Sequence, residues 1–193
     1  MNNKHKQTWS LADHQNRYGK NFNQGLADWV INNLKFNSLL EFGCGAGHYC
    51  KYWSDKGIKY IHGIEPEPMD DQNFKNKECK QFCYDITQQE EPADLFSEYD
   101  VIFTLEVLEH IDFKFHDKVF DFFASKKPNT IVFSAARIGQ EGYGHIACRS
   151  KEDWAKQLTD RGYKLDIDQT NSILSSSDKK NVNHRVNLQV FHK

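Results

Sequence analysis

Two glutamates and two histidines have the side-chain types and the spacing that hydroxyl or metal chemistry requires. Glu106, Glu109 and His110 follow an i, i+3, i+4 spacing, which would place all three on one face of a helix. An unperturbed histidine can accept a proton at neutral pH, so we expect His110, His145 and Glu109 to be catalytic. A structural role for either histidine stays open at this point. The same four residues are also a candidate set for Mg²⁺, Mn²⁺ or Zn²⁺.

A second feature is a glycine cluster, since three of the chain's 11 glycines fall between Gly43 and Gly47. They follow an apolar segment and precede a helical one, where a backbone can turn sharply against a ligand. The dinucleotide fingerprint G-x-G-x-x-G fails here because its last position is the bulky His48. Glu41, at the start of the loop, would repel a pyrophosphate and suits a cationic ligand.

Two further acids end the next two predicted strands. Glu65 is placed to bind two ribose hydroxyls, and Asp85 could accept a hydrogen bond from an adenine amine. The alternatives are a solvated strand end for Glu65 and a turn residue for Asp85. Together these acids describe a nucleoside that carries an amine or a sulfonium rather than phosphates.

Alternating strands and helices are needed to bring these residues together. The hydrophobic periodicity predicts helices at 22–35, 47–56, 115–125 and 150–161, and strands at 38–42, 60–65, 80–84, 100–104, 130–134, 163–167 and 186–192. This pattern is typical of an α/β fold with a Rossmann-like, doubly wound sheet of seven strands. The polar loop 171–184 shows no helical pattern, so we expect the last strand to be antiparallel in an otherwise parallel sheet.

The length of 193 residues indicates a single domain over 21–193, preceded by a polar arm over 1–20. We hypothesise that this arm folds over the ligand as a lid. In such sheets the ligand lies at the carboxyl ends of the strands, where the loops 104–114 and 135–149 should converge.

In its motifs the sequence resembles the class I S-adenosylmethionine-dependent methyltransferases, over about residues 18–193. The segment Glu41–Gly47 resembles that family's first motif, E-x-G-x-G-x-G, and Glu65 and Asp85 match its second-strand and third-strand acids. Residues 103–111 resemble its fourth motif in the E-V-L-E-H form. The family's fold, a seven-stranded sheet with an antiparallel last strand, agrees with the pattern read above.

This resemblance implies S-adenosylmethionine as the cofactor. The glycine backbone would lie against its methionine part, with Glu41 near the amino group or ordering the loop. Glu65 would bind the ribose, Asp85 and the Ile86 backbone would meet the adenine, and Leu105 and Glu106 would line the far side. The implied cofactor-binding residues are Glu41, Gly43, Cys44, Gly45, Gly47, Glu65, Asp85, Ile86, Leu105 and Glu106.

The E-x-x-E-H group also resembles the small RNA 3′-end 2′-O-methyltransferases, which use it with a later histidine to hold a metal. Two departures disfavour that reading. The segment Gly142–Ile146 lacks the expected aromatic–acid–aromatic stretch, and the chain has no basic run. Gly142–Ile146, followed by Trp154, instead partly resembles the G-H-x-N segment of sugar-directed methyltransferases, with Ala147 in place of the asparagine. We therefore expect no metal, and keep Glu106, Glu109, His110 and His145 as the set that would hold one.

Charge and composition limit the classes of molecule that the protein is expected to bind and the compartment where it is expected to act. Lysine and arginine total 25 and aspartate and glutamate 27, a net charge of −2, which disfavours nucleic acid as a partner. No apolar run is long enough to span a membrane, and no signal core follows the polar start, so we expect a cytoplasmic protein. The five cysteines have no framework spacing and are expected to be reduced thiols.

The prediction is thus an S-adenosylmethionine-dependent methyltransferase that acts on a small-molecule or glycan-like acceptor, at oxygen. The alternatives are a metal-dependent RNA ribose 2′-O-methyltransferase and a cofactor-binding protein without catalysis. The sequence does not specify the acceptor, its reacting atom, the metal dependence, the oligomeric state or a cellular or viral origin.

Overall fold

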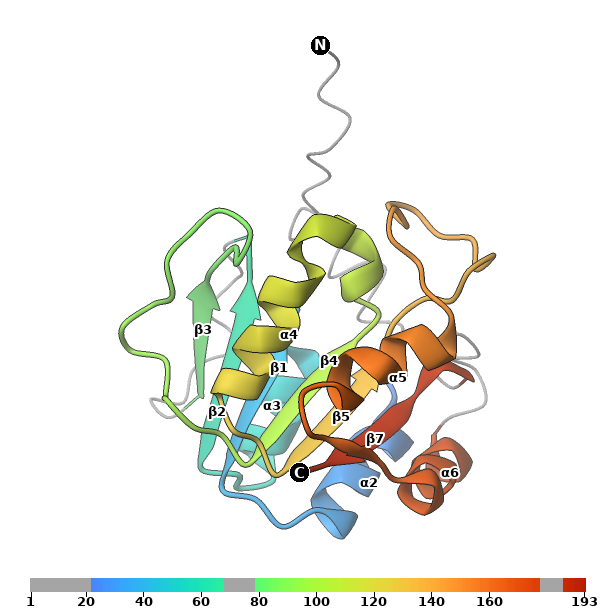
Figure 1. The fold of residues 1–193 in the computed structure, drawn as a ribbon. Helices are drawn as coiled ribbons and strands as arrows, with labels where there is room; N and C mark the ends of the chain where they lie inside the picture. Colours follow the sequence, from blue (N-terminus) through green and yellow to red (C-terminus); the bar gives the residue numbers. More distant parts are fainter. Residues whose placement is uncertain (1–21, 68–78, 178–185) are drawn as a thin grey trace.

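The computed structural model describes residues 22–67, 79–177 and 186–193, which are coloured along the chain in Figure 1. The arm expected over residues 1–20 lies outside this part, so its proposed role as a lid stays a prediction. Within the described ranges, no helix is long and apolar enough to cross a membrane.

A seven-stranded sheet forms the centre of the molecule (Figure 1). The strand order is β3-β2-β1-β4-β5-β7-β6, and every neighbouring pair is parallel except β5–β7 and β6–β7. The predicted doubly wound sheet with an antiparallel last strand is therefore confirmed. The strands are β1 (Ser38–Phe42), β2 (Tyr60–Glu65), β3 (Cys79–Cys83), β4 (Val101–Leu105), β5 (Thr130–Ser134), β6 (Lys164–Leu165) and β7 (Gln189–His192).

Helices cover both faces of the sheet, because the central strands are apolar on both sides. Helices α4 (His116–Ser125) and α5 (Lys151–Thr159) lie in front of the sheet in Figure 1, and α2 (Gln24–Asn33), α3 (His48–Asp55) and α6 (Ile167–Ser176) lie on the other face. Phe120 and Trp154 anchor the front core, while Trp53 and Ile173 belong to the core behind the sheet. This leaves the strand ends and their loops for the site.

Local signals set several helix boundaries. The Ser150 hydroxyl accepts from the Asp153 amide at 3.0 Å and caps α5, as its position predicts. Gly162 follows the same helix with φ of +88°, the left-handed conformation expected of a residue just past a helix end. Asn23 caps α2 by accepting from the Leu26 amide at 3.0 Å.

One sequence expectation is wrong: residues from 171 onward are not simply a loop, because α6 occupies Ile167–Ser176. Asp166 caps this helix by accepting from the Gln169 amide at 2.8 Å, and Ile173 is buried against the rear core. Its outward residues are serine and asparagine, which hide the helical pattern in the sequence. Because α6 starts so early, β6 is two residues long rather than the five predicted.

Candidate active site

The glycine turn after β1 has the backbone shape that its composition predicts. Gly43, Gly45 and Gly47 all have positive φ, at 76°, 51° and 74°, a region that side chains with a Cβ rarely adopt. The amides of Gly43 and Cys44 donate to the Ile64 carbonyl at 2.9 and 3.0 Å. The turn is thereby fixed to the end of β2, with Gly47 at the start of α3.

Glu41 is nearly fully buried beneath this turn. One carboxylate oxygen accepts from the Cys50 amide at 3.1 Å and from the Cys50 thiol at 2.8 Å. Of the two roles implied for Glu41, this contact supports ordering of the loop, because it ties β1 to α3. Burial raises the pKa of Glu41 to about 8, so the side chain is largely protonated at neutral pH.

Glu65 ends β2 directly beside the turn. Its Oε2 accepts from the Gly45 amide at 3.0 Å, and burial raises the pKa of this carboxyl to about 7. A carboxylate at this place can accept hydrogen bonds from a ribose diol. The open glycine backbone and this acid fit the amino-acid and nucleoside parts of S-adenosylmethionine, and a carboxylate beside the turn disfavours a phosphate there.

The third-strand acid is engaged in its own turn. Asp85 Oδ1 accepts from the Thr87 amide at 2.8 Å and from the Thr87 hydroxyl at 2.6 Å, and its Oδ2 accepts from the Gln88 side chain. Ile86 between them is buried in the front core. The carboxylate of Asp85 thus shapes the turn, and its contact with adenine stays a prediction.

The E-V-L-E-H segment is not the regular helix that its spacing suggests. Leu105 is the last residue of β4, Glu106 has a φ of +53°, and only Leu108–His110 form a short 3₁₀ helix, η4. The expectation that Glu106, Glu109 and His110 share one helical face is therefore wrong. The carboxylate of Glu106 instead accepts from Gln140 Nε2 at 2.8 Å and from Asn187 Nδ2 at 3.1 Å.

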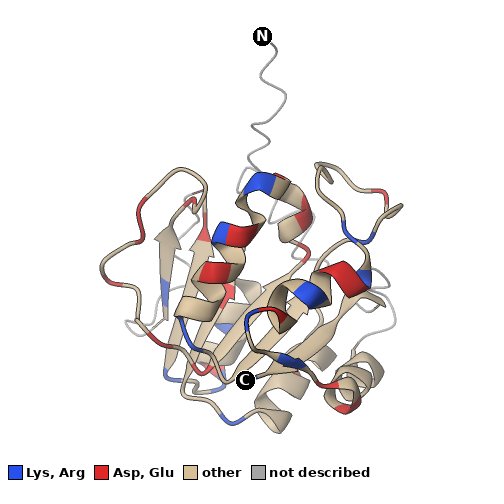
Figure 2. Ribbon diagram, viewed as in Figure 1, with Lys and Arg blue, Asp and Glu red and all other residues tan. Residues whose placement is uncertain are grey.

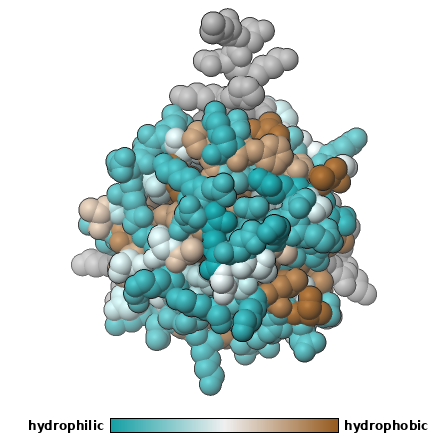
Figure 3. Space-filling model, in the orientation of Figure 1, coloured by the Kyte–Doolittle hydropathy of each residue, from teal (hydrophilic) through white to brown (hydrophobic). Residues whose placement is uncertain are grey.

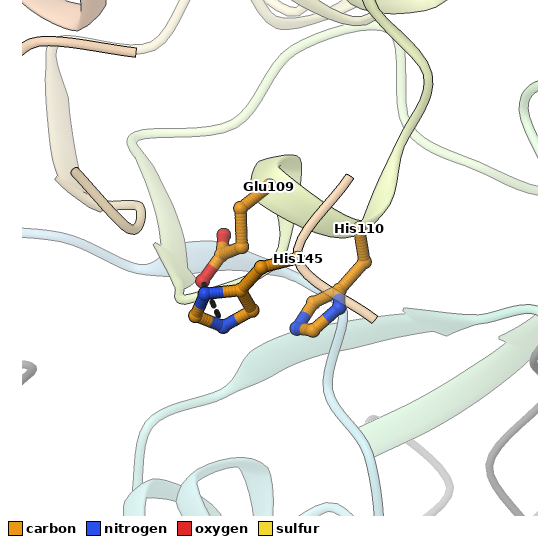
Figure 4. A group of neighbouring side chains, drawn as sticks. All are labelled: Glu109, His110 and His145. Carbon is orange, nitrogen blue, oxygen red and sulfur yellow. Dashed lines mark ion pairs between the residues drawn. The ribbon is translucent and has the colours of Figure 1, made fainter. Parts of the chain in front are cut away.

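Glu109, His110 and His145 do come together, as Figure 4 shows. One potential ligand atom from each lies within 4.8 Å of the others, and His145 Nε2 is 3.9 Å from Glu109 Oε1. The two imidazole rings meet edge to face, with centroids 5.1 Å apart. Three of the four predicted residues therefore form a cluster, and Glu106 stands apart from it.

Backbone carbonyls fix the orientation of both rings. His110 Nδ1 lies 3.0 Å from the Gly144 carbonyl, and His145 Nδ1 lies 3.0 Å from the Gln140 carbonyl. A carbonyl can only accept, so each Nδ1 carries the proton and each Nε2 is the basic nitrogen. Burial lowers the pKa of His110, which keeps this ring neutral near pH 7.

Glu109 is fully buried, and within the described part of the chain neither of its carboxyl oxygens has a hydrogen-bond partner. Burial raises the pKa of Glu109 well above its usual range, and the nearby Glu106 carboxylate raises it further. The main-chain carbonyl of Glu109 accepts from the Ile146 and Ala147 amides at 2.9 and 3.0 Å. These two bonds join η4 to the loop that carries His145.

A third histidine, His116, which the sequence analysis missed, holds the backbone on either side of Glu109 and His110. His116 is buried at the start of α4, and its Nε2 contacts the carbonyls of Leu108 and Ile111 at 3.0 and 2.8 Å. Its Nδ1 accepts from Arg149 Nε at 3.0 Å, and the Arg149 guanidinium lies over the Phe113 ring. Gln140 and Asn187 were missed as well, because no sequence spacing connects them to Glu106.

Two of the loops that carry the cluster residues, or adjoin them, expose large apolar side chains. Ile138 and Tyr143 are 71% and 60% exposed in the loop between β5 and α5, and Phe113 is 48% exposed after η4. Figure 3 shows apolar atoms at the upper right of the molecule, where Figure 1 places the β5–α5 loop. In Figure 2, basic and acidic residues are interspersed over the face that is drawn.

Comparison with known proteins agrees with this geometry. A family model described as a methyltransferase domain matches residues 13–193. The structure is similar to that of a TehB-like S-adenosylmethionine-dependent methyltransferase from Corynebacterium glutamicum. The TM-score is 0.63 and the identity 16%, over 95% of this chain and 100% of the other. No curated protein sequence matches the chain significantly.

Two further solved structures are methyltransferases in complex with S-adenosyl-L-homocysteine. The O-methyltransferase of a trans-AT polyketide synthase from Brevibacillus brevis has a TM-score of 0.62 and 15% identity, over 95% of this chain and 75% of the other. The N-methyltransferase NodS from Bradyrhizobium japonicum has a TM-score of 0.59 and 20% identity, over 74% of each chain. Such identities establish the fold, while the family match spans nearly the whole chain. The chain therefore belongs to the methyltransferase domain family, and it is a class I S-adenosylmethionine-dependent methyltransferase, as its motifs predict.

Proposed function

We propose that this methyltransferase transfers the methyl group to a hydroxyl oxygen of a small, uncharged acceptor. The observation that carries the proposal is the convergence of Glu109, His110 and His145 at the carboxyl end of β4. A hydroxyl is a poor nucleophile until a base takes its proton, whereas a neutral amine needs no such group. Two oriented imidazoles beside a carboxyl suit the hydroxyl reaction.

His145 is the residue that we assign as the base. Its Nδ1–H is held by the Gln140 carbonyl, so its Nε2 lone pair is available for the acceptor proton. When bound, S-adenosylmethionine supplies a methyl group on a positive sulfur, which leaves as a neutral thioether. The hydroxyl oxygen forms the new bond to carbon as its proton passes to His145 Nε2. The Gln140 carbonyl then stabilises the imidazolium through its bond to Nδ1.

Charge and exposure support the acceptor class. The net charge of −2 offers no general attraction for a polyanion. The exposed Ile138 and Tyr143 lie in the loop that carries His145, and the exposed Phe113 lies three residues after His110. This apolar surface suits the body of a small organic acceptor. An RNA acceptor would require phosphate contacts from a basic surface, and the basic and acidic residues are interspersed along the ribbon in Figure 2.

The test is formation of S-adenosylhomocysteine from S-adenosylmethionine with panels of small alcohols, phenols, sugars and amines. We expect turnover with hydroxyl acceptors, and a fall in kcat of at least a hundredfold in His145→Gln with cofactor affinity retained. His192→Gln, a half-buried histidine of β7 outside the cluster, is the matched control. Turnover of amines alone would refute the assignment, and cofactor binding without any turnover would favour the non-catalytic alternative.

A metal centre is the second candidate. The observation that favours it is the buried carboxyl of Glu109, which has no hydrogen-bond partner among the described residues. Ligating histidines typically donate their other N–H to a carbonyl, as His110 and His145 do. Two imidazoles and one carboxylate suit Mn²⁺, Fe²⁺ or Zn²⁺ better than Mg²⁺. Such an ion would act as a Lewis acid on the acceptor oxygen.

Calorimetric titration of chelator-treated protein with MnCl₂ and ZnCl₂ separates the two candidates. The metal-dependent reading predicts binding of one ion per chain, lost in Glu109→Gln, together with activity that the chelator abolishes and the ion restores. Full activity after chelation, with no ion bound, leaves the metal-free base as the mechanism.

A further inference from the structure

Three polar side chains from separate parts of the chain meet next to the cluster, and we call them the Glu106–Gln140–Asn187 group. Glu106 follows β4, Gln140 lies in the loop after β5, and Asn187 lies two residues before β7. Gln140 Nε2 donates to Glu106 at 2.8 Å, and Asn187 Nδ2 donates to Glu106 at 3.1 Å and to Gln140 Oε1 at 2.8 Å. The side chains therefore form a closed ring of hydrogen bonds.

This group is held at the backbone as well. The Glu106 amide donates to the Ser134 carbonyl at 2.9 Å, which extends the β4–β5 pairing by one residue even though φ of Glu106 is +53°. A left-handed conformation at a residue other than glycine is strained, and such conformations are concentrated at functional sites. The main-chain carbonyl of Gln140 holds His145, so the same residue joins the group to the proposed base.

The ring leaves specific hydrogen-bonding capacity unused. A carboxylate has about four acceptor positions, and in the described residues Glu106 receives donors from only two side chains. No lysine or arginine of the described ranges forms an ion pair with Glu106. The Asn187 side chain is only 2% exposed, yet its Oδ1 has no hydrogen-bond partner among the described residues. Gln140 Nε2 has a second N–H beyond the one that it gives to Glu106.

We propose that the Glu106–Gln140–Asn187 group recognises a second hydroxyl of the acceptor, so that the enzyme selects a neutral polyol; this rests on the proposed hydroxyl methylation. A hydroxyl is both donor and acceptor, and so matches the open carboxylate positions and the Gln140 N–H together. An acceptor phosphate or carboxylate would be repelled by Glu106. An ammonium group would be attracted by Glu106, but it has no lone pair to accept from Gln140 Nε2, whereas a hydroxyl can do both.

The proposal can be tested with matched six-membered rings: cyclohexane-1,2-diol, cyclohexanol and 2-aminocyclohexanol, with methyl glucoside as a larger polyol. We expect kcat/KM for the diol or the glucoside to exceed that for cyclohexanol at least tenfold. In Gln140→Leu the backbone carbonyl that holds His145 is retained, and the diol preference should fall below about threefold through a higher KM. Asn187→Ala should do the same.

The exposed Gln24→Leu and Asn171→Ala are matched controls that should keep the preference. Equal kcat/KM for diol and cyclohexanol in the wild type, or a preference unchanged in both Gln140→Leu and Asn187→Ala, overturns the subsite while the proposed hydroxyl methylation stands. If no hydroxyl compound is turned over, the proposed function fails. Saturation-transfer NMR of the diol with S-adenosylhomocysteine bound then decides: binding weakened tenfold in Gln140→Leu supports the subsite, and absent binding refutes it.

Discussion

The buried Glu41 should make the folded protein less stable as the pH rises through neutrality. The pKa of Glu41 in the fold is about 8 against an ordinary value of 4.5, so the fold favours the protonated carboxyl. Its contribution is fully present below the ordinary value and is lost as the pH rises toward 8. At about 1.36 kcal/mol per pKa unit, the total loss is about 5 kcal/mol, of which about 2.5 kcal/mol falls between pH ~5 and ~7.

Glu41→Gln removes this titration but keeps an oxygen that can accept from the amide and thiol of Cys50. The stability of the variant relative to the wild type should therefore grow by about 2.5 kcal/mol from pH ~5 to ~7, a relative gain in Tm of roughly 5–10 °C for a chain of this size. Urea unfolding and calorimetry at several pH values measure it. The exposed Glu152→Gln is the control. Parallel curves for Glu41→Gln and the wild type would show that the carboxyl is already ionised in the fold.

Three other predictions concern the donor side and the support of the cluster. Gly45→Arg should lower S-adenosylmethionine affinity more than a hundredfold by calorimetry. Gly57→Arg, at a position with φ of +89° and open space around it, should retain affinity despite its own backbone strain. Glu65→Gln should lower the affinity for S-adenosylmethionine about tenfold through the loss of charge-assisted hydrogen bonds. Unchanged affinity would show that Glu65 does not bind the ribose. His116→Phe should cost about 1–3 kcal/mol of folding stability and lower kcat more than cofactor affinity, because the Leu108 and Ile111 carbonyls lose their donor. Equal losses in kcat and affinity would indicate general unfolding.

The sequence predicts those parts of the fold that depend on local pattern. The order of apolar strands, the Ser150 cap and the Gly43–Gly47 turn all follow from residue type and spacing, since each is decided within a few residues. Helix α6 was missed because only two of its residues, Thr170 and Ile173, are buried, and its exposed face is rich in serine. A single-sequence reading also cannot supply contacts between distant loops.

In the candidate site, too, local spacing is predicted well and contacts between distant segments are not. Spacing correctly associates Glu109 with His110, but it assigns Glu106 to them by assuming a regular helix that the left-handed backbone interrupts. Asn187 lies 81 residues from Glu106 along the chain, so only the register of β7 against β5 could bring it there. Tertiary pairing, rather than local propensity, decides this part of the site.

The loop between β5 and α5 has a consequence for how such an enzyme can diversify. It carries His145, Gln140 and the exposed Ile138 and Tyr143. The glycine turn that we expect to bind the cofactor lies on a separate segment, after β1 and bonded to the end of β2. Changes in this one loop can therefore give a new acceptor range without touching the donor machinery. They also move the proposed base, since Gly142 packs so closely on the His145 ring that an added Cβ would lie 2.2 Å from it. Substitutions in this loop are therefore expected to change acceptor range and catalytic rate together, while cofactor affinity stays the same.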